Sequence, residues 1–132
     1  DAIDPASTTK VDLGKIEELK LTDVSARYPG ADVLALVSSV NRPQLRINLD
    51  LYHTQIGEGD LIRWCQACLP WIGEVQVADN PGRCEPGTGE INYHGVAKAL
   101  KAMGYSGPVG LESFAQGDAE AALTAFRAAF TV

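Results

Sequence analysis

Residues 46–50, Arg46-Ile47-Asn48-Leu49-Asp50, form a short apolar strand pattern that ends in a residue able to bind metal. The same pattern, an apolar stretch followed at once by a polar residue, recurs at Glu17, Gln76 and Glu112. The four polar positions are separated by 33, 26 and 36 residues, the length of one strand–helix–strand unit. We therefore expect them side by side at one end of a parallel sheet. Three carboxylates and one amide oxygen there predict a site for a hard divalent cation.

The segments between these strands have helical character. Apolar residues recur with a helical period over residues 31–40, and further helices are expected at 60–69, 92–103 and 118–130. Strands are expected at 15–21, 45–49, 74–78 and 109–111, a turn-rich exit at 50–59, and a long loop at 79–91. Asn92 and Asp118 are expected to start the last two helices, and Gly104 to end the earlier of them. This β-α-β-α-β-α-β-α order predicts an α/β fold with a parallel sheet.

Length and charge limit the function classes. We expect the 132 residues to form a polar tail at 1–14 and one α/β domain at 15–132. A net charge of −6 without a basic cluster argues against nucleic acid or an anionic membrane as a partner. No apolar run approaches the roughly 20 residues of a membrane span. The first residues resemble no signal peptide, so a cytoplasmic location is expected.

The three cysteines have a structural and a chemical interpretation. Cys65 and Cys68 form a C-x-x-C pair inside a helical pattern, where small thiols commonly pack in the core. Zinc binding would need further ligands, such as Cys84 with His94, and no second C-x-x-C pair exists. Core packing is therefore the favoured interpretation.

Two stretches carry a family resemblance. They are D-L-Y-H-T-Q at residues 50–55 and V-Q-V-A-D-N-P-G-R-C-E-P-G-T-G-E-I-N-Y at residues 75–93. Together they resemble the hydroxypyruvate isomerase family, within the xylose isomerase-like barrels, and the resemblance covers about residues 31–132. It implies a TIM-barrel type of α/β fold, of which this chain has about the last four of eight βα units. A whole barrel needs about 250 residues, so a partial or half barrel is expected.

The resemblance also assigns roles to residues. Asp50, Gln76 and Glu112 match three ligands of a divalent metal, Mg²⁺ or Mn²⁺, and Glu112 also matches a catalytic carboxylate. His53 and Arg83 match residues that face the substrate. The fourth ligand and second catalytic carboxylate lies, in the family, in a segment I-E-x-L-N.

The counterpart of that segment here is Ile16-Glu17-Glu18-Leu19-Lys20, which nominates Glu17, with Lys20 in place of the Asn. The implied reaction interconverts hydroxypyruvate and tartronate semialdehyde through an enediolate. Glu17 and Glu112 would move the proton, in roles that the sequence does not distinguish.

Other functions remain open. The chain can be a truncated, non-catalytic half-barrel that binds a metal or a partner, or an epimerase of a related sugar. Open edges of a half-barrel favour a homo-oligomer in which two copies cover each other.

Each candidate residue also has a structural interpretation. Asp50 can cap a turn, Gln76 can lie at a sheet edge, and Glu112 can be a solvated strand end. His53 can be a structural histidine, Arg83 can pair with Glu85 or Glu90, and Glu17 can belong to a solvated face.

Overall fold

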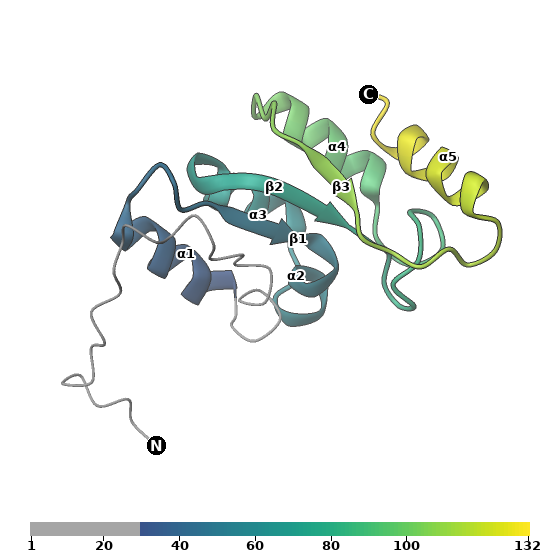
Figure 1. The fold of residues 1–132 in the computed structure, drawn as a ribbon, viewed down its shortest axis with the longest axis horizontal. Coiled ribbons are helices and arrows are strands. Elements are labelled where there is room, and N and C mark those ends of the chain that lie inside the picture. Colours follow the sequence, from purple (N-terminus) through teal and green to yellow (C-terminus); the bar gives the residue numbers. More distant parts are fainter. Residues whose placement is uncertain (1–29) are drawn as a thin grey trace, which may run out of the picture.

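The computed structural model describes residues 30–132, in which three parallel strands alternate with helices (Figure 1). The strands are β1 (Ile47–Asp50), β2 (Ile72–Val77) and β3 (Val109–Leu111). The α-helices are α1 (Gly30–Val40), α2 (Leu51–Gly57), α3 (Leu61–Cys68), α4 (Tyr93–Ala102) and α5 (Ala119–Ala129), and a 3-10 turn, η3 (Leu69–Trp71), precedes β2. The predicted parallel α/β fold is confirmed. The strand expected at 15–21 and the tail at 1–14 lie outside the described residues.

The strand register brings the predicted site positions to one edge of the sheet. The order is β1-β2-β3, so β2 lies in the middle. Asp50 pairs with Gln76 across the β1–β2 ladder, and Gln76 pairs with Gly110 across the β2–β3 ladder. Glu112 follows β3 directly, and its backbone N–H donates to the Val77 carbonyl over 3.0 Å. The carboxyl ends of the three strands therefore form one continuous edge.

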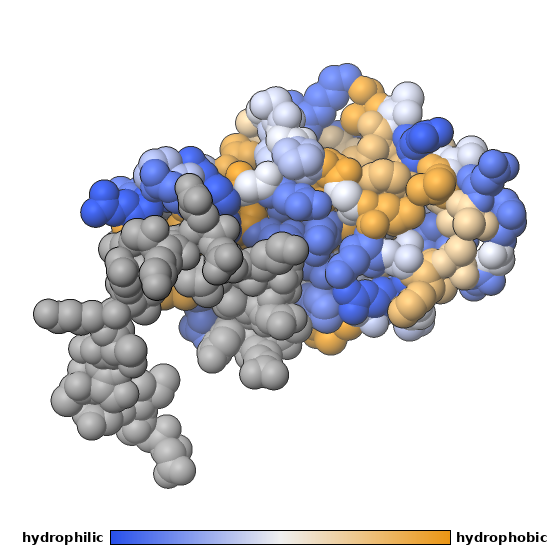
Figure 2. Space-filling model, viewed as in Figure 1, coloured by the Kyte–Doolittle hydropathy of each residue, from blue (hydrophilic) through white to orange (hydrophobic). Residues whose placement is uncertain are grey.

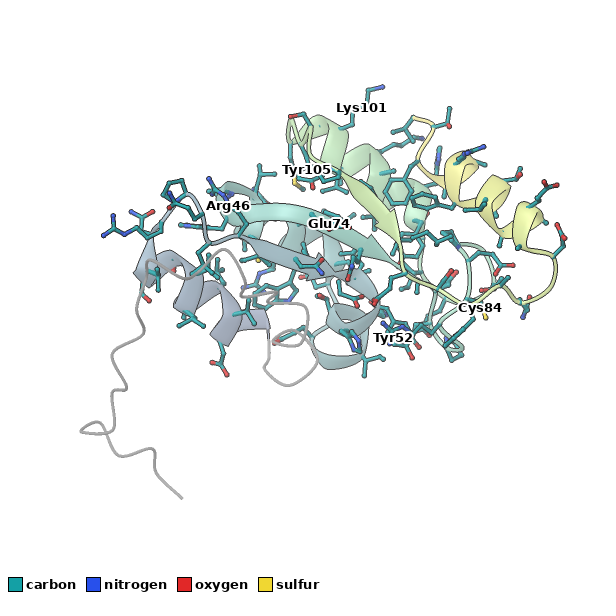
Figure 3. The ribbon with its side chains drawn as sticks, viewed as in Figure 1. Arg46, Tyr52, Glu74, Cys84, Lys101 and Tyr105 are labelled. Atoms are coloured by element: carbon teal, nitrogen blue, oxygen red, sulfur yellow. The ribbon has the colours of Figure 1, made fainter. Side chains whose placement is uncertain are left out.

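The two faces of this sheet differ in polarity, because successive side chains of a strand point to opposite faces. On one face Ile47, Leu49, Val75 and Val77 are buried in the main apolar core. Helices α3 and α4 cover the sheet from behind in the view of Figure 1. The other face carries the polar residues of the alternation, and Figure 3 shows one of them, Glu74, over the middle of the sheet. Figure 2 shows hydrophilic side chains gathered at the centre of this view. In a barrel, this polar face is the one that lines the interior.

Polar caps and one glycine set the ends of the helices. The Asn92 side chain accepts from Gly95 N at the start of α4, and Asp118 accepts from Ala121 N at the start of α5, both over 2.9 Å. Gly104 follows α4 with φ +78°, and its N–H and that of Tyr105 donate to the last helical carbonyls, as in a Schellman motif. These three predicted helix ends are confirmed.

One predicted element was wrong. Residues 50–59 were expected to be a turn-rich exit because of Gly57 and Gly59, but residues 51–57 form helix α2. The physical reason is Asp50, which supplies the N-terminal cap directly after the strand and allows a helix to start without a turn. The glycines lie where the helix ends, and Gly59 has φ +69°.

The thiols of α3 behave as core residues. Cys65 and Cys68 are fully buried and free of disulfide bonds. Burial raises the pKa of Cys65 to about 12 and that of Cys68 to about 11, so both remain protonated at neutral pH. Core packing, the favoured interpretation of this pair, agrees with their burial.

No helix found between residues 30 and 132 is long and apolar enough to cross a bilayer.

Candidate functional site

Among the predicted site residues that the structure describes, Asp50 is the most buried, with 4% of its surface exposed. It lies at the carboxyl end of β1 and caps α2, because its Oδ1 accepts from the N–H groups of Tyr52 at 2.9 Å and His53 at 3.3 Å. The other oxygen, Oδ2, lies 3.6 Å from His53 Nε2 and 3.9 Å from Arg83 Nη2, longer than a hydrogen bond in both cases. One carboxylate oxygen is thus fixed by the backbone, and the other faces two basic side chains.

The electrostatic setting of Asp50 disfavours its negative charge on balance. Burial is the main cause and raises the pKa of Asp50 above its ordinary value. The His53 charge and the two backbone N–H donors lower this pKa, and the nearby negative charge of Glu112 raises it further. A cation at Oδ2 would offset the cost of keeping this carboxylate charged.

Arg83 joins the ends of β1 and β3. Its Nη2 lies 2.6 Å from Glu112 Oε2, and its guanidinium carbon lies 5.3 Å from the centroid of the Tyr52 ring. Because the Arg83 side chain is 31% exposed and that of Glu112 is 51% exposed, solvent screens this ion pair. The residue has φ +55°, a backbone conformation that is uncommon outside glycine.

The two sequence-based alternatives for Arg83 do not occur. Glu85 instead accepts from Gln116 N over 2.9 Å, and Glu90 accepts from Gln55 Nε2 over 3.3 Å. The guanidinium therefore faces the strand ends rather than carboxylates of its own loop.

The structure brings Asp50, His53, Arg83 and Glu112 together at this edge. Gln76 lies between them in the sheet, level with Asp50, and is half-buried. Glu17, the fourth predicted ligand, lies outside the described residues.

The donor chemistry of the three described ligand candidates suits a hard cation. Asp50, Gln76 and Glu112 offer two carboxylates and an amide oxygen at the ends of adjacent strands, the type of ligand that Mg²⁺ and Mn²⁺ prefer. Within residues 30–132 no three His, Cys, Asp or Glu side chains are grouped so as to hold a metal ion. The Arg83 guanidinium supplies the positive charge near the Asp50 and Glu112 carboxylates, at 3.9 and 2.6 Å.

Sequence reasoning missed two residues of the site. Tyr52 was noted only as part of the D-L-Y-H motif, with no role of its own. Its ring lies against the Arg83 guanidinium and packs edge-on to the His53 ring, with the two ring centroids 5.3 Å apart. Asp79 was read as the first residue of a loop, yet it is fully buried. The sequence held no signal for Asp79, because its burial and its three backbone donors arise only in the folded loop.

Comparison with known proteins places this geometry in a family. The sequence matches the xylose isomerase-like TIM barrel family over residues 16–129. The chain belongs to this family.

Among curated relatives, hydroxypyruvate isomerase of Escherichia coli K12 is 43% identical over 90 residues, which cover 68% of this chain and 35% of that protein. A 2-oxo-tetronate isomerase of Cupriavidus necator is 36% identical over 81 residues, 61% of this chain and 31% of that protein. The chain thus spans about a third of the length of these relatives.

A solved structure shows the same fold. The crystal structure of an AP endonuclease, family 2, from Brucella melitensis superimposes with a TM-score of 0.70 at 39% sequence identity. The superposition covers 75% of this chain and 38% of that chain. The three described strands thus correspond to one section of a TIM barrel.

Proposed function

We propose that this chain belongs to a metal-dependent isomerase of a small hydroxy-carbonyl acid and carries part of its active site. The reaction is the interconversion of hydroxypyruvate and tartronate semialdehyde. The observation that supports it is the convergence of Asp50, His53, Arg83 and Glu112 at the strand ends. The relatives named hydroxypyruvate isomerase add the reaction class.

Arg83 binds the substrate carboxylate in this proposal. Its planar guanidinium can donate two parallel hydrogen bonds to a carboxylate, a geometry that lysine does not reproduce. In the described structure Arg83 pairs with Glu112 instead. A substrate carboxylate therefore competes with Glu112 for Arg83, and substrate binding frees Glu112 for chemistry. His53, whose side chain is 26% exposed, donates to a substrate oxygen in this proposal.

The two glutamates move the proton. One carboxylate removes a proton from the hydroxymethyl carbon of hydroxypyruvate, and the electron pair passes into the neighbouring carbonyl to give an enediolate. A proton is then delivered to the former carbonyl carbon, while the hydroxyl of the other carbon passes its proton to the former carbonyl oxygen and becomes the aldehyde oxygen. Glu112 fills one of these roles and Glu17 the other. Glu17, Asp50, Gln76 and Glu112 would hold a divalent cation, which would supply electrostatic stabilisation of the negative charge that develops during proton transfer.

A second candidate function is a non-catalytic half-barrel that binds a metal or a partner. It is motivated by Lys20, which stands in place of the Asn of the family segment I-E-x-L-N that nominates Glu17. Isomerisation of a 2-oxo-tetronate and epimerisation of a sugar use the same proton chemistry. Substrate profiling separates them from the leading proposal.

The proposed assembly is a homo-oligomer in which two copies cover each other's polar sheet face. Two features of the described residues support it. β1 and β3 are the edges of the described sheet, and Asn48 Oδ1 is buried without a hydrogen-bond partner. Light scattering at assay concentration tests the assembly, and a monomeric mass would refute it.

The variant Glu112→Gln tests the proposed chemistry. Glutamine keeps an oxygen donor but cannot take up a proton as a base, so Mn²⁺ binding stays close to wild type and turnover of hydroxypyruvate is lost. The matched control is Glu120→Gln, the same change at an exposed position in the first turn of α5, which leaves turnover unchanged. Wild-type activity in Glu112→Gln would remove Glu112 from the mechanism. Mn²⁺ binding without turnover in the wild type would favour the non-catalytic half-barrel.

A further inference from the structure

We propose that Asp79 is a positioning residue, whose carboxylate fixes the loop between β2 and α4 so that Arg83 is held at the site. The inference rests on the proposed function, in which Arg83 binds the substrate carboxylate. Asp79 lies two residues after the end of β2 and is fully buried. A carboxylate in such a place costs free energy unless several donors surround it.

The carboxylate of Asp79 accepts hydrogen bonds from both the beginning and the end of the loop. Its Oδ1 accepts from Asn80 N at 2.9 Å and from Ile91 N at 3.0 Å, and its Oδ2 accepts from Gly87 N at 2.8 Å. The three donors lie at the start, the middle and the end of the loop. Hydrogen bonds that a backbone N–H donates to a carboxylate are stronger than bonds between neutral groups. One side chain thus joins the two ends of a segment of twelve residues, 80–91, that lies outside regular secondary structure.

The backbone of Asp79 holds the Arg83 turn as well. Asp79 N donates to the Cys84 carbonyl over 2.7 Å, and the Asp79 carbonyl accepts from Arg83 N over 3.0 Å. The loop leaves no space around the carboxylate, because a Cβ at Gly89 would lie 2.7 Å from Asp79 Oδ1 and 2.2 Å from the Asn80 carbonyl oxygen. The turn that orients Arg83 is therefore built directly on Asp79.

The same loop is fastened to the segment after β3. The Arg83 carbonyl accepts from Phe114 N over 2.9 Å, and Glu85 Oε2 accepts from Gln116 N over 2.9 Å. Figure 3 shows Cys84, the neighbour of Arg83, at the same end of the sheet as Tyr52. Loosening the loop at Asp79 thus releases Arg83 relative to both β1 and β3.

The variant Asp79→Asn tests this role kinetically. The asparagine NH₂ group must face either Gly87 N–H or the Asn80 and Ile91 N–H groups, so at least one buried donor loses its acceptor. We expect KM for hydroxypyruvate to rise roughly tenfold to hundredfold, with a much smaller change in kcat, because Arg83 contributes to binding. In an Arg83→Met background the same change at Asp79 has little further effect on KM. A merely structural role would give equal effects in both backgrounds.

The control and the second readout separate loop order from general stability. Val37→Ala removes buried volume from α1 and leaves KM unchanged. Hydrogen exchange of the Gly87, Ile91 and Phe114 amides accelerates in Asp79→Asn beyond any change in Val37→Ala. If Asp79→Asn does not fold, Gly89→Ala disturbs the same carboxylate from the loop side and gives the same pattern.

Two results would overturn the inference: a wild-type KM in Asp79→Asn, or an unchanged exchange rate at these amides. If the wild type turns over no substrate, the proposed function fails. The exchange measurement then still decides whether Asp79 fixes the loop that carries Arg83.

Discussion

Asp50 has two roles that different substitutions separate. Burial disfavours the charged form of its carboxylate, while the same side chain caps the start of α2 and stabilises that helix. Asp50→Asn removes the charge but keeps an oxygen that can accept from Tyr52 N and His53 N. Asp50→Ala removes the charge and the cap together. The two variants are therefore expected to differ in stability although both lack the charge.

The expected difference in free energy of unfolding between the two variants follows from the loss of the helix cap. The two hydrogen bonds to Oδ1, of 2.9 and 3.3 Å, belong to an N-terminal cap, whose removal costs about 1 kcal/mol. Asp50→Asn is expected to equal or exceed the wild type in free energy of unfolding at pH 7, because the buried charge is gone. Asp50→Ala is expected to lie about 1 kcal/mol below Asp50→Asn, or about 4 °C in Tm for a domain of this size.

Urea denaturation, followed by the fluorescence of Trp64 and Trp71 in the presence of a chelator, measures these differences. The direction in which stability changes with pH gives a further test. Since the native pKa of Asp50 is raised above 3.8, the native state binds this proton more tightly than the unfolded state. The contribution of Asp50 to stability therefore falls as pH rises from 3.8 through the raised native pKa, and this component is absent from Asp50→Asn.

Equal stability of Asp50→Asn and Asp50→Ala would refute the capping argument. A wild type that is clearly more stable than Asp50→Asn at pH 7 would refute the argument that burial dominates at this carboxylate.

Three further predictions concern the rest of the chain. At pH 8 a thiol reagent should label only Cys84 rapidly, because Cys65 and Cys68 are buried and have raised pKa values. The variant Cys84→Ser should abolish the fast phase of labelling, and rapid labelling of a second thiol would contradict the described core. Tyr93→Phe should cost roughly 1 to 3 kcal/mol in urea denaturation, because the hydroxyl donates over 2.6 Å to a buried carbonyl. Asp118→Ala should cost about 1 kcal/mol through the lost cap of α5, and a neutral result would show that this end frays.

Much of the fold was predictable because strand and helix patterns in this chain are strong and local. The β3 strand was predicted at the observed residues, 109–111, and Asn92 and Asp118 gave the starts of α4 and α5 through their capping chemistry. Helix α2 was not predicted, because its seven residues are too few to show a helical period and its cap, Asp50, was read as the end of a strand.

The sequence nominated residues of the candidate site but not their contacts. The resemblance nominated Arg83, but the sequence offered Glu85 and Glu90 as its partners because they are near in the chain. The observed partner, Glu112, lies 29 positions away and is brought close by the β2–β3 pairing. The role of Asp79 depends on three backbone donors whose positions are fixed only by the folded loop, so no sequence pattern revealed it.

The most direct test of the account is calorimetric titration of Mn²⁺ into the wild type and into Asp50→Asn, a variant that keeps the cap and is expected to stay folded. We predict stoichiometric binding in the wild type and much weaker binding in Asp50→Asn, because the amide lacks the negative charge that the buried Asp50 carboxylate offers a cation with little solvent screening. The charge of Glu112, whose side chain is 51% exposed, is screened by solvent, so its loss in Glu112→Gln costs less. Absence of binding in the wild type, or equal binding in both proteins, would contradict a metal site at these strand ends.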